Sequence, residues 1–95
     1  MDEHPGIGFV DGPAGRRAVL VGTGLDVWEV IEIVKANRGS AAATARYLEL
    51  PEARVRDAVR YYAAFSQEID DWLTRQAAAA EREEAAARRE RAILL

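Results

Sequence analysis

The chain has 95 residues, a formal net charge of −3 and a hydrophobic fraction of 49%, much of which is alanine. That length corresponds to one small domain with a modest core, which argues against a deep catalytic pocket. The lack of cysteine excludes disulfides and thiolate metal sites. No apolar run approaches the roughly 20 residues that cross a bilayer, and the acidic start MDEHPG does not resemble a signal peptide. We therefore expect a cytoplasmic protein without membrane contact, and any contact with DNA should be confined to a local patch.

Two short β-prone runs open the chain, Ile7 to Val10 and Arg17 to Val21. They flank Asp11-Gly-Pro-Ala-Gly15, which is rich in turn residues, so we predict a hairpin with a loop of roughly five residues. Arg16 and Arg17 stand at the edge of this loop, where a wing contacts phosphates, although paired loop arginines are more often only solvated. The hairpin also precedes the helices, whereas the wing of most winged-helix proteins follows the recognition helix.

A helix is predicted from Asp26 to about Asn37, because Asp26 followed by Glu29 is typical of a capping box. Its apolar stripe is Val27, Val30, Ile31 and Val34. Trp28 lies beside this stripe and is expected to pack under the hairpin as ordinary core. Ile33 lies on the other flank, where either a partner subunit or the core could cover it. Gly39 is expected to end the helix as a left-handed C-cap.

The segment from Ser40 to Tyr62 reads as two short helices joined by a tight turn. Pro51 suits the first turn of a helix and marks the start of the second one. The first helix carries small or apolar residues near helical spacing: Ala43, Ala45 and Leu48. The second carries an apolar stripe of Val55, Ala58, Val59 and Tyr62, and an outward face of Ala53, Arg56, Asp57 and Arg60.

A packed helix, a short turn and an arginine-bearing second helix are typical of a DNA-reading helix-turn-helix. We expect Arg56 and Arg60 to contact bases or phosphates, and Arg46 and Arg54 to contact mainly phosphates. Two subunits of a homodimer would then read a two-fold-related site. The alternative is a plain αα-hairpin whose charges form a solvated face, because Glu49 occupies the turn position where glycine is usual, and acidic residues partly neutralise the arginines.

The last segment is predicted to be a long helix with Ser66 as its N-cap. Its early turns carry a short stripe of Ile69, Trp72, Leu73 and Gln76. From Ala77 the chain is almost wholly Ala, Glu and Arg until Ile93-Leu-Leu95, which gives strong helix propensity and little to bury. Such a segment, about 28 Å long as a helix, is either a solvated extension or an arm that folds on a partner.

Catalytic and metal-binding patterns are missing from the sequence. His4 is the only histidine and lies in an N-terminus that we expect to be mobile, so no catalytic triad or histidine metal cluster forms within one chain. Glu68, Asp70 and Asp71 are better explained as charges at a helix start. Gly22-Thr-Gly24 lacks the rest of a phosphate-binding fingerprint. We therefore expect that the protein is not an enzyme and that it binds neither a metal nor a cofactor.

From about Arg16 to Ile69 the chain resembles a family of small bacterial and archaeal proteins known as a domain of unknown function. The resemblance rests on RRAVLVGTGLDVWEVIE and YLELPEARVRDAVRYYAAFSQEID, of which the Val-Trp pair and the paired tyrosines are the most distinctive parts. Many members are VapB-like antitoxins encoded beside toxins with a PIN-like nuclease fold. Gly24 stands where the family has arginine and Glu49 where it has glycine, so no role is carried over to those two positions.

The resemblance implies an antitoxin of a type II toxin–antitoxin system that neutralises a PIN-like ribonuclease and represses its own operon. The predicted fold is mainly α, with an N-terminal β-hairpin, a helix-turn-helix three-helix body and a long C-terminal helix. Residues 1–65 would form the winged or helix-turn-helix DNA-binding domain, and residues 66–95 the helical arm that binds the toxin.

The arm supplies the residues expected to contact the toxin. The apolar anchors would be Trp72, Leu73, Ile93, Leu94 and Leu95, and the arginines that enter the acidic nuclease site would be Arg88, Arg89 and Arg91. One alternative is a stand-alone transcription regulator whose C-terminal helix is a dimerisation element. A second is a protein-binding adaptor that keeps the helix-turn-helix shape without binding DNA.

Overall fold

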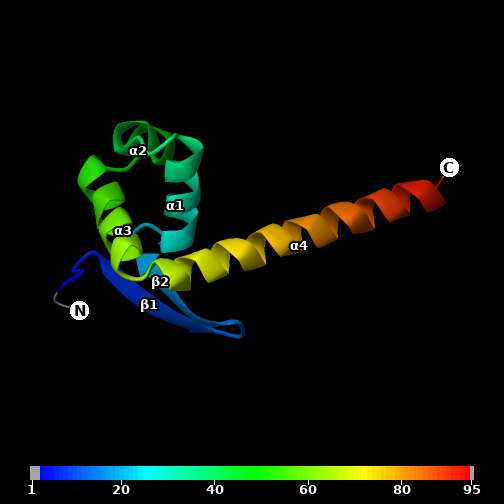
Figure 1. Cartoon of the computed structure of the whole chain (residues 1–95), viewed down its shortest axis with the longest axis horizontal. Coiled ribbons are helices and arrows are strands. Elements are labelled where there is room, and N and C mark those ends of the chain that lie inside the picture. The colour runs from blue at the N-terminus through cyan, green and yellow to red at the C-terminus, as the bar shows by residue number, and fades with distance from the viewer. Residues whose placement is uncertain (1–2, 95) are drawn as a thin grey trace.

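The computed structural model describes residues 3–94 and shows a mainly helical protein with a small sheet at one side and a long projecting helix (Figure 1). The elements in chain order are β1 (Ile7–Gly12), β2 (Gly15–Leu20), β3 (Leu25–Asp26), α1 (Val27–Ala36), α2 (Ala41–Leu48), α3 (Glu52–Ala64) and α4 (Ser66–Ile93). This order confirms the expected fold class, in which a β-hairpin is followed by three short helices and a long C-terminal helix.

The sheet has three antiparallel strands in the order β1-β2-β3. Gly12 pairs with Gly15, so the hairpin loop is only Pro13-Ala14, and the expected five-residue loop is wrong because the turn residues on either side continue the strands. The third strand was not expected either. Thr23 turns the chain back into it, since its hydroxyl donates to the Leu20 carbonyl oxygen at 2.7 Å and accepts from the Leu25 N–H at 3.1 Å.

Local capping fixes both ends of α1. The capping box is confirmed: the backbone N–H of Asp26 donates to Glu29 Oε1 at 2.9 Å, and the Asp26 side chain caps the Glu29 backbone in return. At the other end, the N–H of Gly39 donates to the Val34 carbonyl at 2.9 Å, as in a Schellman motif. The first left-handed residue there is Arg38 with φ 55°, although we expected that role for Gly39, which follows it with φ 85°.

A three-residue turn from Glu49 to Pro51 joins α2 to α3. Ser40 caps α2, since its Oγ accepts from the Ala43 N–H at 3.0 Å. Glu49 is left-handed with φ 58° and ψ 44°, so the turn takes the backbone shape that glycine usually provides, at a cost of about 1 kcal/mol for a residue with a Cβ. Pro51 is the N-cap of α3 and so lies one position before the first turn where we expected it.

The core lies between the sheet, α1, α3 and the beginning of α4. On α3 the buried row is Val55, Ala58 and Tyr61, whereas the predicted stripe contained Val59 and Tyr62. Val59 is in fact exposed, and Tyr62 is only half-buried. The difference arises because the sheet and α4 both pack on the Tyr61 side of the helix, which the spacing of apolar residues along α3 does not specify.

The N-terminal segment is part of this core, and the expectation that His4 is mobile is wrong. The His4 ring is buried and packs edge-on against Tyr61, with ring centroids 5.3 Å apart, and against Phe65 at 5.9 Å. Its carbonyl oxygen accepts from the Ile7 N–H at 3.0 Å, which leads the chain into β1. An aromatic cluster at the C-terminal end of α3 therefore holds the first described residues in place.

The long helix α4 has two parts with different environments. It begins at Ser66 with Phe65 at the N-cap position, so the expected cap by Ser66 is wrong by one residue. Ile69 and Trp72 are buried against the body, and Leu73 packs on the same core. After Gln76 the helix leaves the body and projects as an arm, which explains the long axis of 55 Å against 30 and 22 Å (Figure 1). Within residues 3–94, no helix is long and apolar enough to span a membrane.

Candidate nucleic-acid interface and projecting arm

The outer face of α3 presents two arginines beside an apolar groove. Arg56 and Arg60 lie one helical turn apart, and their side chains are 62% and 60% exposed. They border a groove of about 440 Å³ between α3 and the junction of α1 with α2, lined by Val34, Gly39, Ala41, Arg56, Val59, Arg60 and Ala63. The pattern of charges predicted the two arginines, but it did not predict the groove, because its other wall comes from α1 and α2.

Each of these two arginines has a carboxylate partner on its own helix. Arg56 Nη2 lies 2.7 Å from Glu52 Oε1, and Arg60 Nη1 lies 3.3 Å from Asp57 Oδ1. Ion pairs between exposed side chains contribute about 0–1 kcal/mol, so a phosphate can replace Glu52 at Arg56 at little cost, whereas Asp57 is 25% exposed and also pairs with Arg54. The pairs therefore keep the two guanidinium groups beside the groove, where both remain exposed to a ligand.

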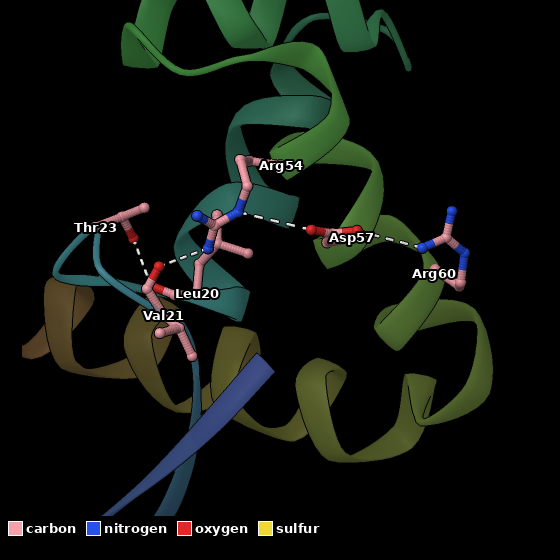
Figure 2. A network of polar contacts seen from close by, with 6 residues as sticks. All are labelled: Leu20, Val21, Thr23, Arg54, Asp57 and Arg60. Carbon is pink, nitrogen blue, oxygen red and sulfur yellow. Dashed lines mark hydrogen bonds and ion pairs between the residues drawn. The ribbon is translucent and has the colours of Figure 1, made fainter. Parts of the chain in front are cut away.

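Arg54 has a structural role that the sequence did not predict. Its Nη2 donates to the Val21 carbonyl oxygen at 2.6 Å, and its Nε lies 3.6 Å from Asp57 Oδ2 (Figure 2). Asp57 thus sits between Arg54 and Arg60, and the side chain of Arg54 is only 30% exposed. Because Arg54 joins α3 to the end of β2, it is a structural cross-link, and its expected contact with phosphates stays a prediction. Arg46, by contrast, lies exposed in the last turn of α2.

The hairpin arginines are also held by neighbours. The Arg16 guanidinium lies 4.1 Å from the centre of the Phe9 ring, and Arg17 Nε lies 3.2 Å from Asp26 Oδ2. Trp28 Nε1 donates to the same carboxylate at 3.0 Å. Trp28 therefore packs beside the hairpin as predicted, and Arg17 fastens the hairpin to the start of α1.

Two tyrosines at the end of α3 fasten α4 to the body. The Tyr61 hydroxyl donates to Glu68 Oε1 at 2.9 Å, and the Tyr62 hydroxyl donates to Asp70 Oδ1 at 2.7 Å. Burial of the ring, together with the hydrogen bond and the negative charge of Glu68, raises the pKa of Tyr61 to about 12. Glu68 and Asp70 were expected to be only helix-start charges, but they also fix the direction in which α4 leaves the body.

The residues expected to bind a partner fall into two groups. Trp72 and Leu73 pack on the body of their own chain and so have a role in the fold, while the expectation that they anchor a partner stays a prediction. On the arm, Ile93 and Leu94 are 80% and 67% exposed. Arg88, Arg89 and Arg91 are also exposed, with Arg88 Nη1 3.0 Å from Glu84 Oε1. Leu95 lies outside the described residues.

A scan against models of known protein families and searches of curated proteins and of solved structures found no match to this chain. The resemblance to the antitoxin family therefore stays a prediction, and the functional argument rests on the geometry of the chain itself.

Proposed function

We propose that this protein is an antitoxin and autorepressor, whose body binds operator DNA and whose arm neutralises a PIN-like nuclease. The observation that carries the proposal is the separation of two surfaces: an arginine-bearing face on α3, and an exposed apolar arm end at the far tip of α4. Because these surfaces lie on different parts of the molecule, one chain can contact DNA and a protein at the same time.

For DNA, α3 acts as the recognition helix. It is 13 residues long, is fixed on its inner side by Val55, Ala58 and Tyr61, and enters the major groove with Arg56 and Arg60 outward. Arginine recognises guanine through two hydrogen bonds or neutralises phosphate, and an exposed Val59 between the two suits a thymine methyl group. Arg46, in the last turn of α2, contacts the DNA backbone at the rim of the same major groove.

For the nuclease, the arm provides both an apolar contact and positive charge. Ile93 and Leu94 are the anchors, and Arg88, Arg89 and Arg91 approach the carboxylates that line a PIN-type metal site. The arm reaches such a site without moving the body, because the first turns of α4 are already packed on it.

The test pairs two variants that serve as controls for each other. One carries Arg56→Ala and Arg60→Ala, and the other ends at Gln76. We expect the arginine variant to keep the product of the neighbouring gene in a pull-down but to lose DNA affinity, with the slope of log K against log salt reduced by about 2. We expect the truncated chain to bind DNA and to lose the partner. If full-length protein fails to hold the neighbouring gene product, the antitoxin proposal is wrong.

A stand-alone regulator that dimerises through α4 is the second candidate. The exposed apolar end of the arm, Ile93 and Leu94, suits a second copy of the chain as well as a nuclease. For this function, the chain that ends at Gln76 would lose dimers and DNA binding together, and no neighbouring nuclease would be held. An adaptor without DNA would keep all of its activities in the arginine variant.

A further inference from the structure

The groove beside α3 combines an apolar lining with positive charge at its edge. Of the described residues that line it, the charged ones are Arg56 and Arg60, and none is acidic. The rest of the lining comes from the end of α1, the turn after it and both other helices of the body: Val34, Gly39, Ala41, Val59 and Ala63. A ligand that fills this groove therefore meets an apolar surface and two guanidinium groups.

The size of the groove fits a small molecule better than a protein. Its volume of about 440 Å³ lies within the range of about 300–1,000 Å³ that is typical of small-molecule sites. A stable protein interface involves about 20–30 residues on each side, far more than line this groove. The lining residues of α3 extend from Arg56 to Ala63, which is about 10 Å along the helix axis, so the groove suits an elongated ligand.

The two arginines give the groove a preference for an anion. Among the described residues, the hydrogen bonds of these side chains use Nη2 of Arg56, towards Glu52, and Nη1 of Arg60, towards Asp57. Each guanidinium has further N–H donors that can form paired hydrogen bonds with a carboxylate. Because Arg54 also pairs with Asp57, three arginines here meet two carboxylates, and this part of α3 keeps a net positive charge.

We infer that this groove binds a small carboxylate with an elongated apolar body, and that this ligand and DNA exclude each other. The carboxylate lies at Arg56 and Arg60, and the apolar body lies on Val34, Val59 and Ala63. The proposed DNA contact uses the same two arginines and Val59, so a chain with a filled groove has no recognition face left for its operator. A carboxylate of this class would thus release the repressor.

The binding of the carboxylate does not depend on the proposed function, whereas its effect on DNA rests on it. The first experiment therefore contains no DNA. The full chain is titrated with octanoate by two-dimensional NMR, with octanol as the uncharged control and octylammonium as the cationic one. Octanoate should shift the amide signals of Gly39, Ala41, Val59 and Ala63 and should bind at least about tenfold more tightly than either control.

Two outcomes of this titration would overturn the proposal. If octanol binds as tightly as octanoate, the arginines do not select an anion. If millimolar octanoate leaves the groove signals unchanged, the groove does not take this class of ligand. A dilution series of the protein alone tests a second copy as the occupant, because groove signals that shift with protein concentration would assign the groove to a segment of another chain and contradict the proposal.

Variants of α3 locate the bound carboxylate. Ala63→Glu puts a negative charge into the groove and keeps both arginines, so it should weaken octanoate about tenfold. Ala64→Glu is the matched control, because it adds the same charge at an exposed neighbour outside the lining, and octanoate should bind it as it binds the parent. Arg56→Gln with Arg60→Gln should lower the affinity for octanoate to that for octanol. Equal losses in the two glutamate variants would contradict binding in the groove.

The effect on DNA is measured by fluorescence anisotropy with a labelled fragment from upstream of the gene. Octanoate at ten times its dissociation constant should weaken the apparent affinity for DNA about tenfold, since the two ligands compete for one face. Sodium chloride at equal concentration is the control, because salt alone weakens DNA binding. If saturating octanoate leaves the DNA affinity at the control value, the mutual exclusion is wrong. If the chain binds octanoate but no DNA, the exclusion and the proposed function are both wrong, while the assignment of the groove stands.

Discussion

The hydrogen bond between Tyr61 and Glu68 couples the arm to the body, and its loss has a pH dependence that can be worked out from the structure. Replacing Tyr61 by Phe keeps the buried ring and removes the hydroxyl that donates to the carboxylate at 2.9 Å. A hydrogen bond to a charged group contributes somewhat more than a neutral one, so the variant should be about 1–2 kcal/mol less stable at neutral pH.

At alkaline pH the order of stability should reverse. The pKa of Tyr61 is raised from 10.0 to about 12 in the folded protein, so the unfolded chain loses this proton first. Stability that depends on the neutral phenol is complete below pH 10 and is lost as the pH rises through 12. A shift of 2 units corresponds to about 3 kcal/mol. The parent should therefore lose about 1.4 kcal/mol per pH unit relative to Tyr61→Phe, and the two stabilities should cross near pH 11.

The assay is urea unfolding followed by tryptophan fluorescence and circular dichroism, at intervals between pH 7 and pH 12. All other titrating groups are common to both proteins, so the difference between their free energies of unfolding isolates Tyr61. Glu68→Gln serves as a second variant, because it keeps an acceptor, removes the charge and should bring the pKa part of the way back towards 10. A difference that stays constant from pH 7 to pH 12 would refute the reasoning, since it would mean that Tyr61 titrates alike in both states.

Five further substitutions, at four positions, are tested by urea unfolding. Glu49→Gly should stabilise the protein by up to about 1 kcal/mol, because glycine adopts the left-handed backbone without strain. Glu49→Ala removes the same charge but keeps a Cβ, so it should not stabilise the protein. If the two variants gain equal stability, the gain comes from the loss of the charge and the reasoning is wrong. Arg54→Met should cost about 1–2 kcal/mol because the bond to the Val21 carbonyl is lost, and an unchanged stability would contradict its structural role. Trp72→Ala should lower the free energy of unfolding by about 3–5 kcal/mol, because the side chain is buried. Ile93→Ala should lower it little in dilute monomer, because that side chain is exposed. Similar losses for the two variants would contradict their different burial.

The sequence predicted those parts of the fold that local chemistry determines. The start of α1 follows from the Asp26 and Glu29 capping box, and the break between α2 and α3 follows from Pro51. The strand β3 could not be found in this way, because a two-residue strand has no periodicity and exists only through pairing with β2. The hairpin loop was overestimated, since the glycines at both ends of the turn are also able to pair as strand residues.

The candidate site shows the same division between local and long-range information. Helical spacing was enough to place Arg56 and Arg60 on the outer face of α3. It did not reveal that Arg54 bonds to a backbone carbonyl 33 positions earlier in the chain, because that contact depends on where the sheet docks. Likewise, the stripe around Trp72 had the correct period for burial, but periodicity alone does not distinguish the body of the same chain from a partner.

The packing of the first turns of α4 explains why its arm can remain helical without a core of its own. An isolated alanine-rich helix of this length is only marginally stable, mainly because its first turn is costly to form. Here Ile69 and Trp72 hold the first turns against the body, and Tyr61 fixes Glu68 at the helix start, so the arm only extends a helix that already exists. A second copy or a protein partner then meets a preformed surface and does not have to order the backbone, which lowers the entropy lost on binding. The contacts that orient the arm therefore also contribute to its affinity, although none of them lies in the proposed interface.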